Sequence, residues 1–160
     1  MSGSVKTQGS KLYVVDILTA SVAAIVALEC PTGISGLGGA ADQIEDTCLD
    51  NTEDKSFLRG LGNPGQVTVP FNLIPDSVSQ QLLWQMKEAG DVYHWMIGLS
   101  DGVSAPTLAG EAFATPPTDR TFLGFDAYVS DLNIDIATNT IVKGTLTLQR
   151  SGEVTPYWKV

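Results

Sequence analysis

A cluster of acidic residues in the first half of the chain is the part best suited to chemistry, because carboxylates can bind a metal ion. Asp50, Thr52 and Asp54 stand at alternate positions, as the first ligands of a calcium-binding loop do. Such a loop also needs a glycine at its sixth position and a glutamate at its twelfth. Lys55 and Leu61 occupy these two positions. The pattern therefore does not predict a calcium site, and we expect no bound metal.

The glycine-rich run from Gly36 to Ala41 precedes these acids and invites comparison with a phosphate-binding loop. A dinucleotide-binding loop requires a strand before it and a helix after it, and a Walker loop ends in Lys-Ser or Lys-Thr. An acidic segment follows the run instead, and no such Lys-Ser or Lys-Thr ending is present. We therefore predict a structural turn, with no nucleotide or other cofactor.

Enzymatic catalysis has few suitable side chains in this sequence. The single histidine, His94, lies in an apolar run beside Trp95, which favours a core or interface histidine over a general base. One histidine and two cysteines are too few for a typical zinc site. We also expect no nucleophile elbow of the hydrolase type. The prediction is therefore no catalytic residue and no enzymatic activity.

The composition of the chain limits the kinds of molecule to which it can bind and the compartment in which we expect it. A chain of 160 residues predicts one domain, and its formal net charge is −9. Binding nucleic acid by neutralising phosphates needs clustered Lys and Arg, so the acidity argues against it. Cys30 and Cys48 form no Cys-x-x-Cys pair, and we expect free thiols in a reducing cytoplasm. The most apolar stretch, Ala20 to Leu28, is too short to span a bilayer, so no membrane anchor or signal peptide is expected.

The elements that must position these residues are mostly strands. Pro70 lies within one alternating run and lacks a backbone donor, which predicts an edge or bulged strand. The apolar positions change parity between Val129 and Leu132, and such a switch predicts a bulge or corner. Thr138-Asn139 predicts the turn of a hairpin. The predicted strands cover residues 12–18, 22–28, 66–73, 92–99, 112–115, 120–136 and 140–149.

One helix is predicted, from about Ser77 to Ala89. Ser77 and Gln80 have the spacing of a capping box, in which each side chain bonds the other residue's backbone amide. Gly90 follows as a C-terminal stop. One face of this helix is apolar and is expected to pack across a sheet or close a barrel; its members are Val78, Leu82, Met86 and Ala89, with Leu83 beside them.

The segment from Ile34 to Gly65 has no sustained helical or strand period, and we predict a long loop. Compact domains rarely keep so long a loop unless it binds something. Disordered linkers lack large apolar residues, whereas this segment contains Ile34, Leu37, Ile44, Leu49, Phe57, Leu58 and Leu61. We therefore expect the loop to pack against a partner, such as another copy of the chain.

The same segment resembles the tail tube, or major tail, proteins of long-tailed bacteriophages. The matching runs are Ile34 to Asp50, ISGLGGAADQIEDTCLD, and Phe57 to Leu61, FLRGL. In that family a glycine turn precedes Ile-acid-x-Thr-x-Leu-Asp, which an aromatic residue and Gly-Leu then follow. Later elements agree in order: a strand with Asn72, a helix start at Pro75-Asp76, and the run GFDAYVSDLNI. The resemblance covers most of the chain.

The resemblance implies a fold and an assembly. The fold is all-β with one flanking helix, a sandwich or barrel of the phage tail tube type with about eight strands. We expect a flexible arm over residues 1–11, a sandwich domain over 12–152 with the loop 34–65, and a tail over 153–160. Tail tube subunits form rings, usually of six, which stack into a hollow tube in the virion tail, assembled in the host cytoplasm. DNA passes through the lumen without specific binding.

The resemblance also implies the partners: further copies of the chain, and the tape-measure, tail-tip and tail-terminator proteins. The contact between subunits is expected to use the loop acids, their basic neighbours, an aromatic residue and the tail tryptophan. These residues are Asp46, Asp50, Glu53, Asp54, Lys55, Phe57, Arg59 and Trp158. Two alternatives stay open: the tube protein of a contractile tail or secretion machine, and a monomeric adaptor or binding module at the tail end.

Overall fold

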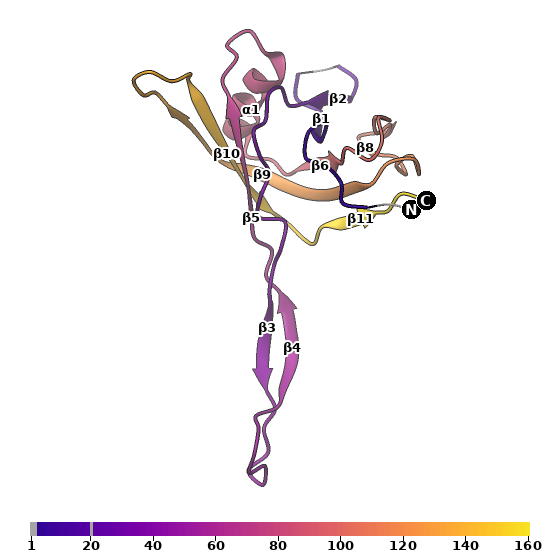
Figure 1. Cartoon of the computed structure of the whole chain (residues 1–160), viewed down its shortest axis with the longest axis vertical. Helices are drawn as coiled ribbons and strands as arrows, with labels where there is room; N and C mark the ends of the chain where they lie inside the picture. The colour runs from indigo at the N-terminus through magenta and orange to yellow at the C-terminus, as the bar shows by residue number, and fades with distance from the viewer. Residues whose placement is uncertain (1–2, 20) are drawn as a thin grey trace.

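The computed structural model describes residues 3–19 and 21–160, and it consists of strands with one helix (Figure 1). The helix is α1 (Val78–Ala89). More strands are present than the sequence predicted, because the segment 34–65 and the C-terminal tail both contribute. They are β1 (Lys11–Asp16), β2 (Ala24–Ala27), β3 (Ala41–Glu45), β4 (Phe57–Gly62), β5 (Gln66–Asn72), β6 (Tyr93–Gly98), β7 (Leu108–Ala109), β8 (Ala112–Phe113), β9 (Phe122–Asp135), β10 (Lys143–Arg150) and β11 (Thr155–Tyr157).

The main sheet is antiparallel and follows the order β2-β1-β6-β9-β10-β5. Strand β11 pairs with the first part of β9, next to the place where β10 pairs with the second part. The terminal strand β5 contains Pro70, as predicted for an edge. The chain leaving β2 then runs along β5, with bridges from Pro31 to Phe71 and from Ser35 to Thr68. The segment after β2 therefore covers the free edge of β5, which protects that edge from pairing with another chain.

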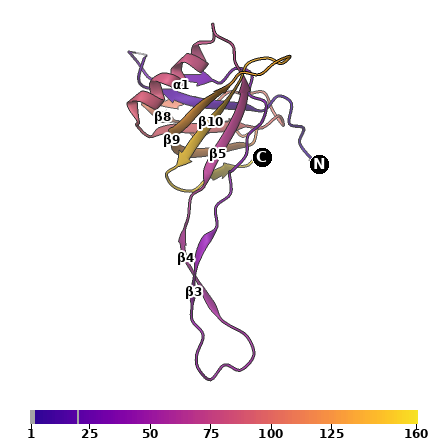
Figure 2. The same ribbon diagram turned by 90° about the vertical axis from the view of Figure 1, so that its left-hand side faces the viewer.

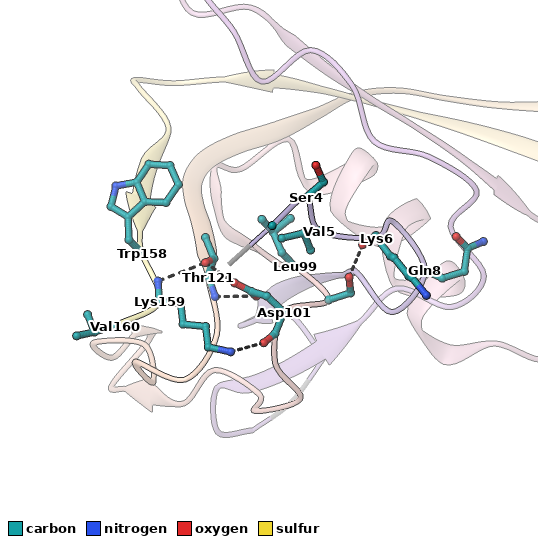
Figure 3. Close-up of a pocket in the computed structure, with 12 residues that line it drawn as sticks. Ser4, Val5, Lys6, Gln8, Leu99, Asp101, Thr121, Trp158, Lys159 and Val160 are labelled. Atoms are coloured by element: carbon teal, nitrogen blue, oxygen red, sulfur yellow. Dashed lines mark hydrogen bonds between the residues drawn. The ribbon is translucent and has the colours of Figure 1, made fainter. Parts of the chain in front are cut away.

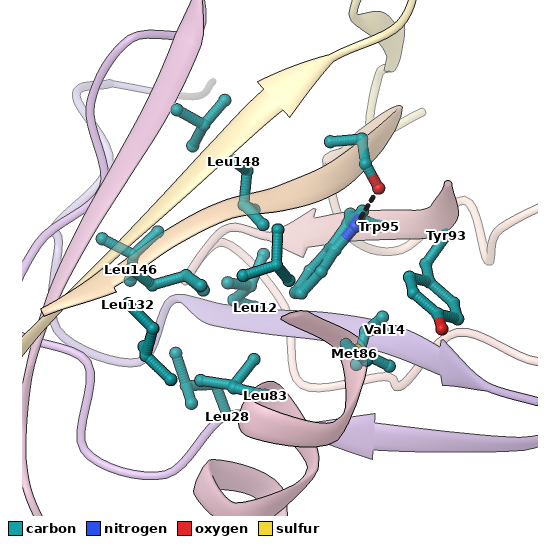
Figure 4. Packing of buried hydrophobic residues seen from close by; sticks show 14 of the residues in the cluster. Leu12, Val14, Leu28, Leu83, Met86, Tyr93, Trp95, Leu132, Leu146 and Leu148 are labelled. Carbon is teal, nitrogen blue, oxygen red and sulfur yellow. Dashed lines mark hydrogen bonds between the residues drawn. The ribbon is translucent and has the colours of Figure 1, made fainter. Parts of the chain in front are cut away.

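The core lies between the curved sheet and α1 (Figure 4). Strand β5 alternates as predicted, with Val67, Val69 and Phe71 buried. Trp95 is buried, and its indole N–H donates to the Ala127 carbonyl at 3.0 Å, so the polar end of the ring is satisfied. The sheet and helix together enclose one contiguous apolar cluster, as expected for one sheet covered by one helix.

The bulge predicted from the parity switch is present in β9. Leu132 pairs with Leu146 and Asp131 with Thr147, but Leu148 pairs with Val129. One residue of β9 is therefore skipped in the register, which turns both Val129 and Leu132 toward the core.

The helix begins and ends where predicted, but its capping differs. The Gln80 amide donates to the Ser77 hydroxyl at 3.5 Å, and Gly90 adopts the left-handed conformation after the last turn. The reciprocal half of the capping box is wrong, because the Gln80 side chain bonds elsewhere. Its amide nitrogen donates to the carbonyls of Glu29 and Asn72, and its oxygen accepts from Ile74. Gln80 thus ties the helix to the strands.

The predicted apolar face of α1 is also rotated. Leu82, Leu83 and Met86 are buried, but Val78 is 74% exposed and Ala89 is exposed too. Because buried Ser79 and Gln80 serve the polar contacts at the helix start, the first turn presents them inward.

Arg120 is a buried charged residue without a counter-charge: it is 2% exposed and forms no salt bridge with any described residue. Its guanidinium donates to the carbonyls of Gly9, Gly98, Leu99 and Ser104 and to the Tyr13 hydroxyl. These acceptors come from the N-terminal segment, β1, the end of β6 and the following loop. A Cβ at Gly98 would lie 2.6 Å from the guanidinium carbon, so only glycine fits there. Arg120 therefore fastens four segments together.

We predict that Arg120→Met lowers the free energy of unfolding by about 3 kcal/mol, because several buried acceptors lose their donor. Urea denaturation measures the change. Arg59→Met is the matched control, since the Arg59 side chain is largely exposed, and it should leave the midpoint unchanged. An Arg120→Met midpoint equal to that of the unsubstituted chain would show that the buried network does not stabilise the fold.

Candidate functional site

The segment predicted as a long loop contains a β-hairpin that projects from the main sheet (Figures 1 and 2). Strands β3 and β4 pair only with each other, with Ile44 opposite Leu58 and Glu45 opposite Phe57. The prediction of an unstructured loop is therefore wrong. The register shifts between Ala41 and Gln43, and both faces of the hairpin are exposed, so the sequence lacks the alternation that marks a half-buried strand.

The hairpin presents apolar side chains on both faces. Residues directly opposite each other share a face, so Ile44 and Leu58 lie together, 54% and 55% exposed, while Phe57 lies on the other face beside Glu45. Leu49 at the tip is fully exposed. A two-stranded hairpin is marginally stable alone, and exposed apolar groups of this kind mark a surface that packs against another molecule.

Glycines at the base of the hairpin allow neighbouring backbone segments to pack closely there. Gly36 has φ 88°, and a Cβ there would clash with the Gln66 carbonyl. A Cβ at Gly39 would lie 2.7 Å from the Asn63 carbonyl oxygen. The buried Arg150 guanidinium donates to the Gly38 carbonyl. The glycine run is thus a structural turn, as predicted.

The hairpin tip is strongly acidic. Lys55 pairs with Glu45 at 3.7 Å, and Arg59 pairs with Glu153 at 3.9 Å. The remaining acids of the tip form no ion pair with a described residue; they are Asp46, Asp50, Glu53 and Asp54. Within residues 3–19 and 21–160, no group of three His, Cys, Asp or Glu side chains is placed to hold a metal ion.

A second surface lies between the two chain ends, where the N-terminal segment and the residues after β11 border a groove of about 840 Å³ (Figure 3). Asp101 organises this groove. Its carboxylate accepts from the Thr121 amide at 3.0 Å and from the Thr121 hydroxyl at 2.6 Å. The Lys159 ammonium donates to the Asp101 backbone carbonyl at 2.7 Å, and the Lys159 amide donates to the Thr121 hydroxyl. These bonds hold the C-terminal residues against the sheet.

The ionisation of Asp101 is coupled to this arrangement. Burial raises the pKa of the Asp101 carboxyl, but the two hydrogen bonds from Thr121 and the nearby Lys159 charge outweigh it, so the pKa lies below its ordinary value of 3.8. Because the folded-state pKa is lowered, the ionised carboxylate stabilises the fold above pH 3.8, and the contribution is lost as the pH falls through the folded pKa.

We predict that Asp101→Asn lowers the free energy of unfolding at pH 7 by about 1–2 kcal/mol, because a charged acceptor is replaced by a neutral amide. The difference from the unsubstituted chain should shrink as the pH falls to about 3. Urea denaturation at both pH values measures it, with exposed Glu111→Gln as the control. A difference that does not change with pH would contradict this role of the carboxylate.

Two residues bear on the expectation of no catalysis. His94 was predicted to be a core or interface histidine. It is exposed, with Nδ1 2.5 Å from the Asp126 carboxylate, so the core alternative is wrong and the interface alternative stays a prediction. The sequence analysis also missed a Gly-x-Ser-x-Gly match at Gly98-Leu99-Ser100-Asp101-Gly102. The Ser100 hydroxyl donates to the Lys6 carbonyl, and a turn follows where a nucleophile elbow has a helix. The geometry does not form a Ser-His-Asp site from these residues.

Seven of the eight residues predicted for subunit contact lie on the hairpin or its tip, and the eighth, Trp158, borders the groove between the termini. The structure therefore brings the seven together and separates Trp158 from them. Sequence reasoning counted Ile44, Leu49 and Leu58 among the apolar residues of a segment expected to pack against a partner, and the structure leaves all three exposed. It missed Val5 and Lys6 of the groove, for which the sequence carries no such signal.

This architecture is shared with chains of phage tails and related injection machines. The fold is similar to that of a chain in the baseplate of the anti-feeding prophage (TM-score 0.69, 13% identity, covering 99% of this chain and 98% of that one). It is also similar to the SPP1 tail tube protein (TM-score 0.64, 11% identity, covering 98% and 81%). A chain in the tail of a gene transfer agent particle is comparable (TM-score 0.61, 12% identity, covering 90% and 93%).

The chain belongs to the family described as phage tail tube, TTP, lambda-like, which it matches over residues 3–160. A relative from Pseudomonas phage PAJU2, named Structural protein 3, is 37% identical over 153 residues, covering 93% of this chain and 91% of that protein. The predicted family, the all-β fold with one helix, and the role as a structural protein of the virion tail tube are thereby confirmed. No helix in the described ranges is both long and apolar enough to cross a membrane.

Proposed function

We propose that this subunit assembles into rings of six that stack into a hollow tube, and that the projecting hairpin makes the contact between rings. The observation that carries the proposal is the hairpin itself, which exposes apolar side chains on both faces and pairs with no further strand among the described residues. The similar anti-feeding prophage baseplate is described as 6-fold symmetrised, and the gene transfer agent tail as having C6 symmetry.

A projecting arm is suited to assembly that propagates. It projects from the body of its own subunit (Figure 2), so it can reach a different surface on the next copy. Contacts between unlike surfaces continue from copy to copy unless a rotation closes them. A tube needs both behaviours, closure within a ring and propagation along the axis. The proposed contact residues on the hairpin are Asp46, Asp50, Glu53, Asp54, Lys55, Phe57 and Arg59.

The charge of the chain suits a conduit for DNA. The formal net charge is −9, and like charge disfavours adhesion of phosphates to the wall. DNA is therefore proposed to pass without specific binding, and the subunit to have no enzymatic activity. Assembly is proposed to take place in the bacterial cytoplasm, with tape-measure, tail-tip and terminator proteins as partners. The similarity to chains in a tube-terminating cap and a sheath/tube terminator supports the last of these.

The second candidate is the tube protein of a contractile machine. The fold is similar to a chain in the sheath-tube complex of an extracellular contractile injection system (TM-score 0.64, 15% identity, covering 97% and 92%). The lambda-like family match favours a tube without a sheath. Micrographs of the native particle distinguish the two, since only the contractile machine has a sheath. A monomeric tail-end adaptor is the third candidate, and it predicts no self-assembly.

Negative-stain electron microscopy of the concentrated protein tests the proposal. We expect stacked rings or hollow tubes of uniform width. Because some tubes need an initiator, the same test is run with tail-tip and tape-measure proteins added. Dispersed monomers under both conditions would overturn the tube proposal and favour the adaptor.

We predict that replacing residues 46–56 with Asn-Gly leaves a folded monomer that does not form tubes. Glu45 and Phe57 are paired across the hairpin, so a two-residue turn can join them without changing the register. Circular dichroism and urea denaturation serve as the control for folding, and electron microscopy measures assembly. Tubes formed by the folded variant would exclude the tip from the contact between rings.

A further inference from the structure

The groove between the chain termini has the features of an acceptor surface. Trp158 is 70% exposed and Val5 is 44% exposed on its rim, and Leu99 lies between them in its lining. Figure 3 shows these apolar side chains on both sides of the groove. The hydrogen bonds of Asp101, Thr121 and Lys159 hold its C-terminal wall in place. The groove is therefore preformed, apolar in part and open to solvent.

The groove contains basic side chains in an otherwise acidic chain. Lys6 and Lys159 line it, together with Val160 and with Asp101, whose carboxylate is hydrogen-bonded to Thr121. The chain as a whole has 9 basic and 18 acidic residues, and Lys6 offers an ammonium group that an acidic segment of a partner can approach. No hydrogen bond or ion pair with a described residue is recorded for the Lys6 ammonium.

The hairpin tip has the complementary features. It presents Leu49, which is fully exposed, next to Asp50. Asp46, Glu53 and Asp54 lie in the same tip, and only Lys55 opposes them in charge. An apolar side chain flanked by carboxylates matches an apolar groove flanked by ammonium groups, and charge complementarity of this kind selects the partner and its register.

We propose that the hairpin tip of one copy docks in the groove between the termini of a second copy, with Leu49 near Val5 and Trp158 and with Asp50 near Lys6. This inference rests on the proposed function, and it assigns Trp158 and the acidic tip to the two sides of one contact. In a single copy the tip lies far from the groove (Figure 1). Each copy therefore gives one tip and receives another, which generates an open series.

A charge exchange tests the docking. We expect Asp50→Lys and Lys6→Glu each to raise the concentration needed for half-maximal assembly by about ten-fold, a loss of about 1.4 kcal/mol. Combining the two should restore assembly to within about three-fold of the unsubstituted chain, because opposite charges again face each other. Lys143→Glu, an exposed lysine on β10, is the matched control and should have no effect. Absence of recovery in the double variant would overturn the pairing.

A cross-link tests the geometry independently of charge. Cys48 is exposed beside Leu49, so Val5→Cys in a Cys30→Ser background places one thiol on each side of the proposed contact. Oxidation of assembled protein should give a ladder of disulfide-linked oligomers on a non-reducing gel. Ile141→Cys in the same background is the control, since Ile141 lies exposed between β9 and β10, away from the groove, and it should give no ladder.

The outcomes separate this inference from the proposed function. If the unsubstituted protein forms tubes but neither the charge exchange nor the Val5→Cys cross-link succeeds, the groove is not the acceptor, and the tube assignment stands. If the unsubstituted protein forms no tubes with or without added tail proteins, the proposed function fails and this inference fails with it. Recovery and a ladder together support the docking.

Discussion

A two-stranded hairpin cannot bury apolar side chains on its own two faces. This constraint decides which surfaces of the molecule are available for contact with another molecule. In the part of the chain that the structure describes, β3 and β4 pair only with each other, so Ile44 and Leu58 on one face and Phe57 on the other remain in water. Covering them requires another molecule, because the hairpin projects away from its own body (Figure 1). The local structure therefore favours the proposed contact with another copy, and the acidic tip restricts which surface can accept it.

The hairpin can hold a partner in a fixed position only if its own base is held in place. Buried arginines form hydrogen bonds at the hairpin base and in the body of the protein. Arg150 bonds the Gly38 carbonyl at the base of the hairpin, where Gly36 and Gly39 allow the strands to approach closely. Arg120 joins the N-terminal segment to three other parts of the sheet. The Arg120 guanidinium bonds four carbonyls and one hydroxyl at once, which only a side chain with several fixed N–H donors can do. The chain thus combines a helix-covered sheet with one projecting hairpin.

The sequence alone was sufficient to predict the elements in which some side chains face the core and others face solvent. The alternation in β5, the bulge between Val129 and Leu132, and the ends of α1 follow from the periodicity of burial. Prediction failed where that periodicity is absent. The hairpin is exposed on both faces, and Gln80 leaves its capping position to bond Glu29 and Asn72. Seven contact candidates were placed on the hairpin from the family pattern, whereas the groove depends on residues far apart in sequence that only the fold assembles.

Hydrogen–deuterium exchange of residues 41–62, compared between the dispersed subunit and assembled tubes, tests the central claim most directly. The account predicts rapid exchange in the dispersed subunit, because an isolated hairpin opens easily. It predicts strong protection of the same amides in the tube, while the amides of β9 exchange slowly in both states. Equal exchange of the hairpin in the two states would contradict the claim, since the arm would then remain uncovered after assembly.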